Sequence, residues 1–149
     1  MIAPLELSYE IDCPVEHAFD VWTTRLSSWW PKGHSASGDP DTVVTLEPRL
    51  GGRIFERTPD GNEIDWGEIT AWNPPHRLAY LWHIARDRAD ATDVQLTFVD
   101  LGEGKTRLDI VHAGWERLGA EAASWRDANT TGWSAMLPSF IEVAERTHR

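Results

Sequence analysis

Residues 122–143, AASWRDANTTGWSAMLPSFIEV, decide which fold the rest of the chain can adopt. Apolar side chains recur here at steps of three or four residues, the period of an amphipathic helix with one buried face. The stripe consists of Ala122, Trp125, Asn129, Trp133, Met136, Phe140 and Val143, with Asn129 as its strongly polar member. Pro138 cannot donate a helix hydrogen bond, so we expect it to bend this long C-terminal helix or to divide it in two.

The segments upstream of this helix have the pattern of short strands. In residues 5–11, LELSYEI, apolar and polar side chains alternate, which is typical of a half-buried strand. Turn signals such as Pro59–Asn62 and Gly102–Gly104 separate the later segments. Six further strands are predicted at residues 42–47, 53–57, 63–72, 77–84, 92–99 and 106–113. Because the connections between them are short, the strands should form an antiparallel meander.

Two short helices are expected after the first strand. Pro14 suits the first position of a helix that extends to about Thr23, and a second helix should cover residues 26–30. Residues 32–41 are rich in turn-forming residues and should form a loop. A seven-stranded antiparallel sheet and one long helix with an apolar stripe pack best when the sheet curves around the helix. The expected class is therefore α+β, with a helix-grip fold.

Composition limits the kinds of partner. The 149 residues fit one domain, residues 1–149, and 14 basic against 24 acidic residues give a formal charge of −10. Such a surface repels phosphate groups, so we expect neither nucleic-acid nor membrane binding. Cys13 is the single cysteine and can form no internal disulfide. The first ten residues lack the features of a signal peptide, so the expected location is the cytoplasm.

The chain contains nine tryptophans, an unusually large number. They could form a core and rim of large rings, or they could line a pocket, because ligand pockets favour aromatic walls. Trp29 and Trp30 are adjacent and cannot both face the same core direction on a helix. We expect one of them to line the core or the pocket mouth and the other to lie nearer the surface.

Four separated segments resemble the SRPBCC superfamily, in particular its branch of heat-shock-protein-90 ATPase activator homologues. They are residues 11–19 (IDCPVEHAF), 47–53 (EPRLGGR), 66–78 (WGEITAWNPPHRL) and 112–116 (HAGWE), the last followed by Gly132, Trp133 and Leu137. The resemblance implies a helix-grip fold with a deep cavity between the sheet and the C-terminal helix. The superfamily includes lipid-transfer domains, polyketide cyclases, plant hormone-binding proteins and a self-sacrificing antibiotic-resistance protein. The branch takes its name from a co-chaperone that carries an additional N-terminal domain, for which we expect no room in this chain.

From the resemblance and the apolar stripe, we predict a cavity that binds a ligand. Its predicted lining residues are Trp30, Trp66, Trp82, Phe98, Ile110, His112, Asn129, Trp133 and Met136. Asn129 needs hydrogen-bond partners if it is buried, and His112, on the inward side of the last strand, could be one. The pair could hold the helix to the sheet, or Asn129 could orient a ligand. His112 could also act as a general base.

Other kinds of chemistry have little support in the sequence. The six histidines show no spacing typical of metal ligands, so neither a metal nor another cofactor is expected. Cys13 lies near a helix start but has no recognisable base, and a small buried residue is the better interpretation. The pair Gly51-Gly52 lacks the residues of a phosphate-binding loop and is interpreted as a turn.

Three functional hypotheses remain. The favoured one is a binding protein for a small lipophilic or aromatic molecule. The second is a cyclase-like or hydrolytic enzyme that acts on a polyketide-type substrate, with His112, Asn129 or an acid assisting proton transfer. The third is an interaction protein that contacts a chaperone through its acidic surface and exposed rings. The chain is expected to be a monomer or a homodimer.

Overall fold

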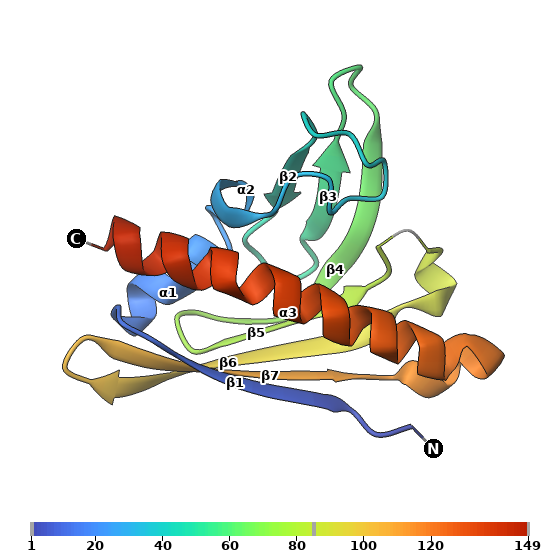
Figure 1. Ribbon diagram of the computed structural model, residues 1–149. Helices are drawn as coiled ribbons and strands as arrows, with labels where there is room; N and C mark the ends of the chain where they lie inside the picture. The colour runs from blue at the N-terminus through green and yellow to red at the C-terminus, as the bar shows by residue number, and fades with distance from the viewer. Residues whose placement is uncertain (1, 85, 149) are drawn as a thin grey trace.

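The structure, a computed structural model, describes residues 2–84 and 86–148. Its elements follow the predicted order of one strand, two short helices, six strands and a long helix (Figure 1). They are β1 (Leu5–Ile11), α1 (Val15–Trp22), α2 (Leu26–Trp29), β2 (Val43–Leu46), β3 (Arg53–Arg57), β4 (Glu63–Asn73), β5 (Arg77–Trp82), β6 (Thr92–Gly102), β7 (Lys105–Ala113) and α3 (Ala122–Thr147). Two short 3-10 helices, η1 (Arg88–Asp90) and η2 (Trp115–Glu121), were not predicted.

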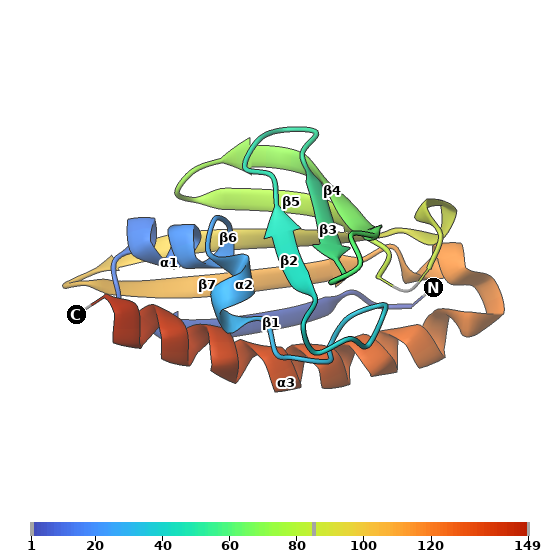
Figure 2. The same cartoon turned by 90° about the horizontal axis from the view of Figure 1, so that it is seen from above.

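All seven strands form one antiparallel sheet, in the order β1-β7-β6-β5-β4-β3-β2. Strands β2 to β7 form a meander. The first strand, β1, lies at the edge of the sheet and pairs with the last strand, β7, with Leu5 opposite His112. The sheet curves so that α3 lies across its concave side, while α1 and α2 cover one end (Figures 1 and 2). This arrangement confirms the predicted α+β helix-grip fold.

The alternation of apolar and polar residues along β6 and β7 places the predicted side chains in the core. Val94, Leu96 and Phe98 of β6 are buried, as are Leu108 and Ile110 of β7. Their polar neighbours along each strand are exposed or only half-buried. Period-two patterning therefore identified the inner face of the sheet correctly.

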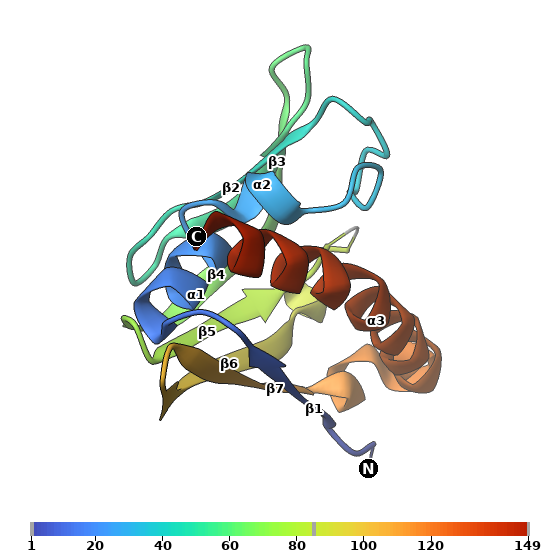
Figure 3. The same ribbon diagram turned by 60° about the vertical axis from the view of Figure 1, so that its left-hand side comes forward.

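Helix α3 runs without a break (Figure 3). It has 26 residues and continues through Pro138. Pro138 and Ser134, whose carbonyl would accept the missing hydrogen bond, both belong to the exposed face of the helix. Water can satisfy that carbonyl, which lowers the cost of the proline. Among the described residues no helix, α3 included, is long and apolar enough to cross a membrane.

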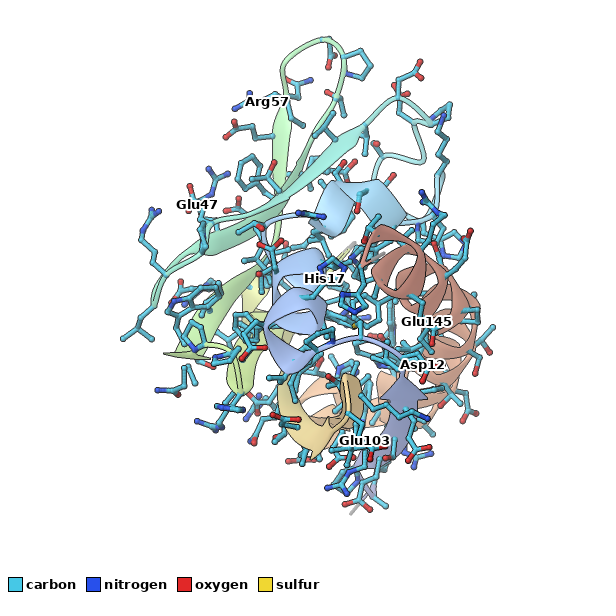
Figure 4. All side chains as sticks on the ribbon, turned by 90° about the vertical axis from the view of Figure 1, so that its left-hand side faces the viewer. Asp12, His17, Glu47, Arg57, Glu103 and Glu145 are labelled. Atoms are coloured by element: carbon cyan, nitrogen blue, oxygen red, sulfur yellow. The ribbon has the colours of Figure 1, made fainter. Side chains whose placement is uncertain are left out.

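The C-terminal end of α3 is fixed to the N-terminal part of the chain. The backbone N–H of Asp12 donates to Glu145 Oε2 at 2.9 Å, and His17 on α1 lies 2.9 Å from the hydroxyl of Thr147 (Figure 4). Cys13 is fully buried beside this junction. Burial, together with the negative charge of Glu145, raises the pKa of Cys13 to about 11, so its thiol is not activated as a nucleophile.

Candidate functional site

A cavity of about 390 Å³ lies between the N-terminal half of α3, strand β5 and the segment that follows α2. Its walls are mostly apolar and include four indole rings and one phenol ring, and few polar side chains reach it. The residues that line it are Trp30, Gly33, His34, Ser35, Tyr80, Trp82, Ile84, Trp125, Ala128, Asn129, Gly132, Trp133 and Met136. A mainly apolar cavity with a few polar groups is the usual form of a small-molecule site.

The cavity brings together five of the nine residues predicted to line it. Trp30, Trp82, Asn129, Trp133 and Met136 border it, whereas the other four do not. Those four, Trp66, Phe98, Ile110 and His112, are buried in the core behind or beside it.

The filled part of the space between sheet and helix lies near α1. Phe19 of α1 packs edge-on against Phe98 at 5.3 Å, and Trp22 packs against Phe140 of α3 at 4.8 Å. These rings occupy the position that a ligand would need in order to reach Phe98. The hollow is therefore confined to the opposite part of the grip.

The aromatic wall is held in place by rings behind it. Trp66 lies 5.1 Å from Trp30 and 5.8 Å from Trp82, measured between ring centroids, and is itself fully buried. Tyr80 packs against Trp82 at 5.7 Å. Burial raises the pKa of Tyr80 far above its ordinary range, and a hydrogen bond from Trp22 offsets this only in part, so the phenol remains neutral.

His112 is a structural link between the sheet and α3. Trp133 Nε1 donates to His112 Nδ1 at 3.0 Å, which leaves the ring proton on Nε2, 2.7 Å from the hydroxyl of Thr92. The Thr92 hydroxyl in turn donates to the carbonyl of Trp82 at 3.2 Å. The imidazole is fully buried, and this burial lowers its pKa to about 3. Because both ring nitrogens are occupied, His112 is not placed to act as a general base on a ligand.

Asn129 and His112, which the sequence allowed as hydrogen-bond partners, do not bond to each other. The Asn129 amide donates instead to the carbonyl of Trp125, one turn earlier in the same helix, at 2.8 Å. Trp133, one turn later, takes the place at His112 that was expected for Asn129. Asn129 is only half-buried and borders the cavity, and its amide oxygen has no hydrogen-bond partner among the described residues.

Glu56 on β3 is a buried carboxylate that the sequence analysis missed. It accepts hydrogen bonds from the amide of Ala36 (2.7 Å), the amide and hydroxyl of Ser37 (3.2 and 2.6 Å), the hydroxyl of Thr42 (3.1 Å) and the indole of Trp66 (2.9 Å). Burial opposes its ionisation, but these hydrogen bonds outweigh burial and lower the pKa of Glu56 below its ordinary value. Glu56 thus fixes both the loop beside the cavity and the ring behind its wall.

The far end of the cavity is bordered by Trp125. The guanidinium of Arg86 lies over its indole at 4.7 Å from the centroid. Arg86 also pairs with Asp90 at 3.0 Å and with Glu121 at 2.8 Å. These contacts connect η1 to the start of α3 and hold the Trp125 ring at this end of the cavity.

The comparison with protein families agrees with this geometry. The family model of Activator of Hsp90 ATPase homolog 1-like proteins matches residues 12–145. The chain belongs to this family. The resemblance to the SRPBCC superfamily that the sequence motifs indicated is thereby confirmed.

Several solved structures of the same fold are similar to the chain. One is the anthrahydroquino-γ-pyrone synthase Txn09, with 36% identity, 83% of this chain and 84% of that chain covered, and a TM-score of 0.62. Another is the self-sacrificing resistance protein CalC from Micromonospora echinospora, with 22% identity, 97% and 96% coverage, and a TM-score of 0.68. An HSP90 activator from Plasmodium falciparum has 22% identity, 75% and 73% coverage, and a TM-score of 0.52. No match was found among curated protein sequences.

The part of the chain that the structure describes contains no cluster of metal-binding side chains. No three side chains of His, Cys, Asp or Glu come together there in a way that could hold an ion. The polar groups at the cavity are the imidazole of His34, the hydroxyl of Ser35 and the amide of Asn129, with the phenol of Tyr80 deeper in the wall. These groups can donate and accept hydrogen bonds to oxygen atoms of an otherwise apolar ligand.

Proposed function

We propose that the chain binds a small, planar, largely aromatic molecule in the cavity between α3 and the sheet. The observation that carries this proposal is the composition of the walls: Trp30, Tyr80, Trp82, Trp125 and Trp133 surround a space of about 390 Å³. Aromatic side chains favour flat apolar ligands because they combine a large contact area with stacking geometry. The fold, in which the sheet and helix leave a hollow between them, is consistent with this role.

The size of the cavity indicates the size of the ligand. A dry apolar cavity of about 150 Å³ holds one benzene molecule. A volume of about 390 Å³ is roughly 2.6 times larger, which corresponds to a skeleton of two or three fused rings. The free amide oxygen of Asn129 is suited to accept a hydrogen bond from a hydroxyl group on such a skeleton.

A substitution at Gly132 tests this proposal without disturbing the core. Gly132 borders the cavity, and a Cβ atom built on it meets no heavy atom within 4 Å. The variant Gly132→Leu should therefore place its side chain in the cavity and weaken binding of a dihydroxyanthraquinone at least tenfold, measured by quenching of tryptophan fluorescence and by calorimetry. Ala135→Leu, on the exposed face of the same helix, is the matched control. Equal affinity in wild type and Gly132→Leu, or no binding of any two- or three-ring compound to the wild type, would contradict the proposal.

A second candidate is an enzyme that acts on a polyketide-type aromatic substrate. The similarity to the synthase Txn09, at 36% identity over most of both chains, supports this candidate. His34 supplies the imidazole at the cavity, and imidazole is the side chain that most often transfers protons in catalysis. In this case His34→Gln should abolish turnover while ligand binding persists. Turnover that survives in His34→Gln would remove this residue from the mechanism.

A contact with an Hsp90-type chaperone is a further candidate, supported by the name of the family. An acidic surface would make such a contact sensitive to ionic strength. Co-purification of the chain with the purified chaperone at low salt, lost at high salt, is the expected result. Absence of complex formation at low salt would rule against it.

A further inference from the structure

A second cavity, of about 230 Å³, lies next to the aromatic one. The two cavities share Trp30, Gly33 and Ser35, so the segment between α2 and β2 forms a common wall. At Gly33 this wall has no side chain, and a Cβ atom there would meet nothing within 4 Å. A ligand that occupied both cavities would therefore pass close to Gly33.

The shared wall is preformed. Trp30 Nε1 donates to the carbonyl of His34 at 2.6 Å, which closes the turn over Gly33. Beyond this turn, the buried carboxylate of Glu56 fixes the amides of Ala36 and Ser37. The second cavity thus has a defined shape beside the first, which is the condition for a specific subsite.

The chemistry of the second cavity differs from that of the first. Polar side chains of Ser27, Ser28, Lys32, Asp39 and Thr42 reach it. The hydroxyl of Ser28 donates to a backbone carbonyl at 2.6 Å, and that of Thr42 is used by Glu56. Within the described residues, the hydroxyl of Ser27 and the ammonium of Lys32 have no hydrogen-bond or ion-pair partner.

Lys32 stands out among the cationic residues. In the described part of the chain, lysine and arginine side chains pair with a carboxylate within 4 Å except at Lys32, Arg77 and Arg126. The guanidinium of Arg126 donates hydrogen bonds to backbone carbonyls of the N-terminal segment, at 2.7 and 3.2 Å. Of the remaining two, Lys32 borders the second cavity. An unpaired cation beside a cavity, in a chain of charge −10, is suited to an anionic group of a ligand.

We infer that the second cavity is a subsite for a carboxylate carried by the ligand, which Lys32 and Ser27 bind while the rings occupy the aromatic cavity. This inference rests on the proposed function and narrows the ligand class to aromatic acids. Asp39 acts against the anion, because this acidic residue borders the same cavity. One of its carboxylate oxygens accepts a hydrogen bond from the amide of Asp41 at 2.9 Å. Its removal should therefore strengthen binding of an acid.

Matched pairs of compounds test the subsite. Each pair consists of an anthraquinone with a carboxylate, attached directly or through alkyl chains of different length, and the corresponding carboxamide. For at least one chain length, the acid should bind the wild type about two- to fivefold more tightly than the amide, as for a single exposed charge pair. Calorimetry at low and high salt measures the affinity for the acid and for the amide. The preference for the acid should decrease as the salt concentration rises.

Variants separate the subsite from the aromatic cavity. Lys32→Met should remove the preference for the acid and leave the affinity for the amide unchanged, whereas Asp39→Asn should increase the preference. Lys105→Met is the control, because it removes the same charge at β7, where Lys105 lies 3.6 Å from Asp12. Acids and amides that bind equally in every pair, or a loss of both in Lys32→Met, would overturn the subsite and leave the proposed function standing. If no acid and no amide binds the wild type, the subsite and the proposed function are both refuted.

Discussion

Acid should destabilise the protein through the buried imidazole of His112. Its pKa is lowered from 6.5 to about 3 in the folded state, so the unfolded chain takes up a proton that the folded chain does not. A group with a depressed histidine pKa contributes stability above its unfolded pKa and loses it as the pH falls toward the folded pKa. Between about pH 7 and about pH 5, linkage with these two pKa values lowers the free energy of unfolding by about 2 kcal/mol.

Chemical denaturation of the wild type and His112→Gln at both pH values measures this effect. Glutamine keeps a donor and an acceptor but does not titrate, so the variant should be less stable at neutral pH and lose about 2 kcal/mol less on acidification. His17, whose pKa is also lowered chiefly by burial, contributes equally to both proteins and cancels in the comparison. An equal loss in the two proteins would refute the reasoning. So would an imidazole resonance of His112 that titrates near its unperturbed value in the wild type, a measurement that needs no variant.

The remaining predictions concern the surroundings of the cavity. Trp133→Phe removes the donor to His112 and leaves a buried acceptor unsatisfied, which should cost about 1–3 kcal/mol in urea denaturation; unchanged stability would contradict the role of this bond. Glu56→Gln turns an amide group toward donors and should speed hydrogen exchange at the amides of Ala36 and Ser37, whereas unchanged exchange would show that the carboxylate does not hold the loop. Gly132→Ala should stabilise α3 by about 0.5–1 kcal/mol in thermal unfolding, because its Cβ enters open space, and a loss of stability would show that this space is not open.

The fold could be predicted because its determinants are local and repeated. The alternation in residues 92–99 and 106–113, and the helical stripe in 122–143, each specify one face of an element. Short turns then leave one simple pairing of the strands. The sequence could not decide whether Pro138 bends the helix or divides it in two. That depends on whether the freed carbonyl faces water, which is determined by how α3 packs.

The details of the cavity depended on the axial position of α3 along the sheet. Asn129 and Trp133 are one turn apart, so a shift of the helix by about 5.4 Å exchanges which of them meets His112. Periodicity carries no information on such a shift. It also does not say that the rings of Phe19 and Trp22 fill the space over Phe98.

The role of Glu56 was within reach of the sequence. Ile54 and Glu56 are two residues apart on β3, so a strand that buries one should bury the other. An inward carboxylate requires several donors, and the loop rich in serine and threonine at residues 35–42 could have been considered as their source. Residue type alone argues against burial at this position, because glutamate is almost never fully buried unless it is paired.

The attachments of α3 determine how a ligand can exchange with solvent. The helix is tied to the rest of the chain near its start by Arg126, in its middle by Trp133 and Ser139, and at its end by Glu145. Because these hydrogen bonds are spread along its whole length, they oppose an outward rotation of the helix about one end. We therefore expect a guest molecule to enter and leave past the exposed residues Gly33 and His34, so that the speed of exchange depends on that short segment more than on the helix.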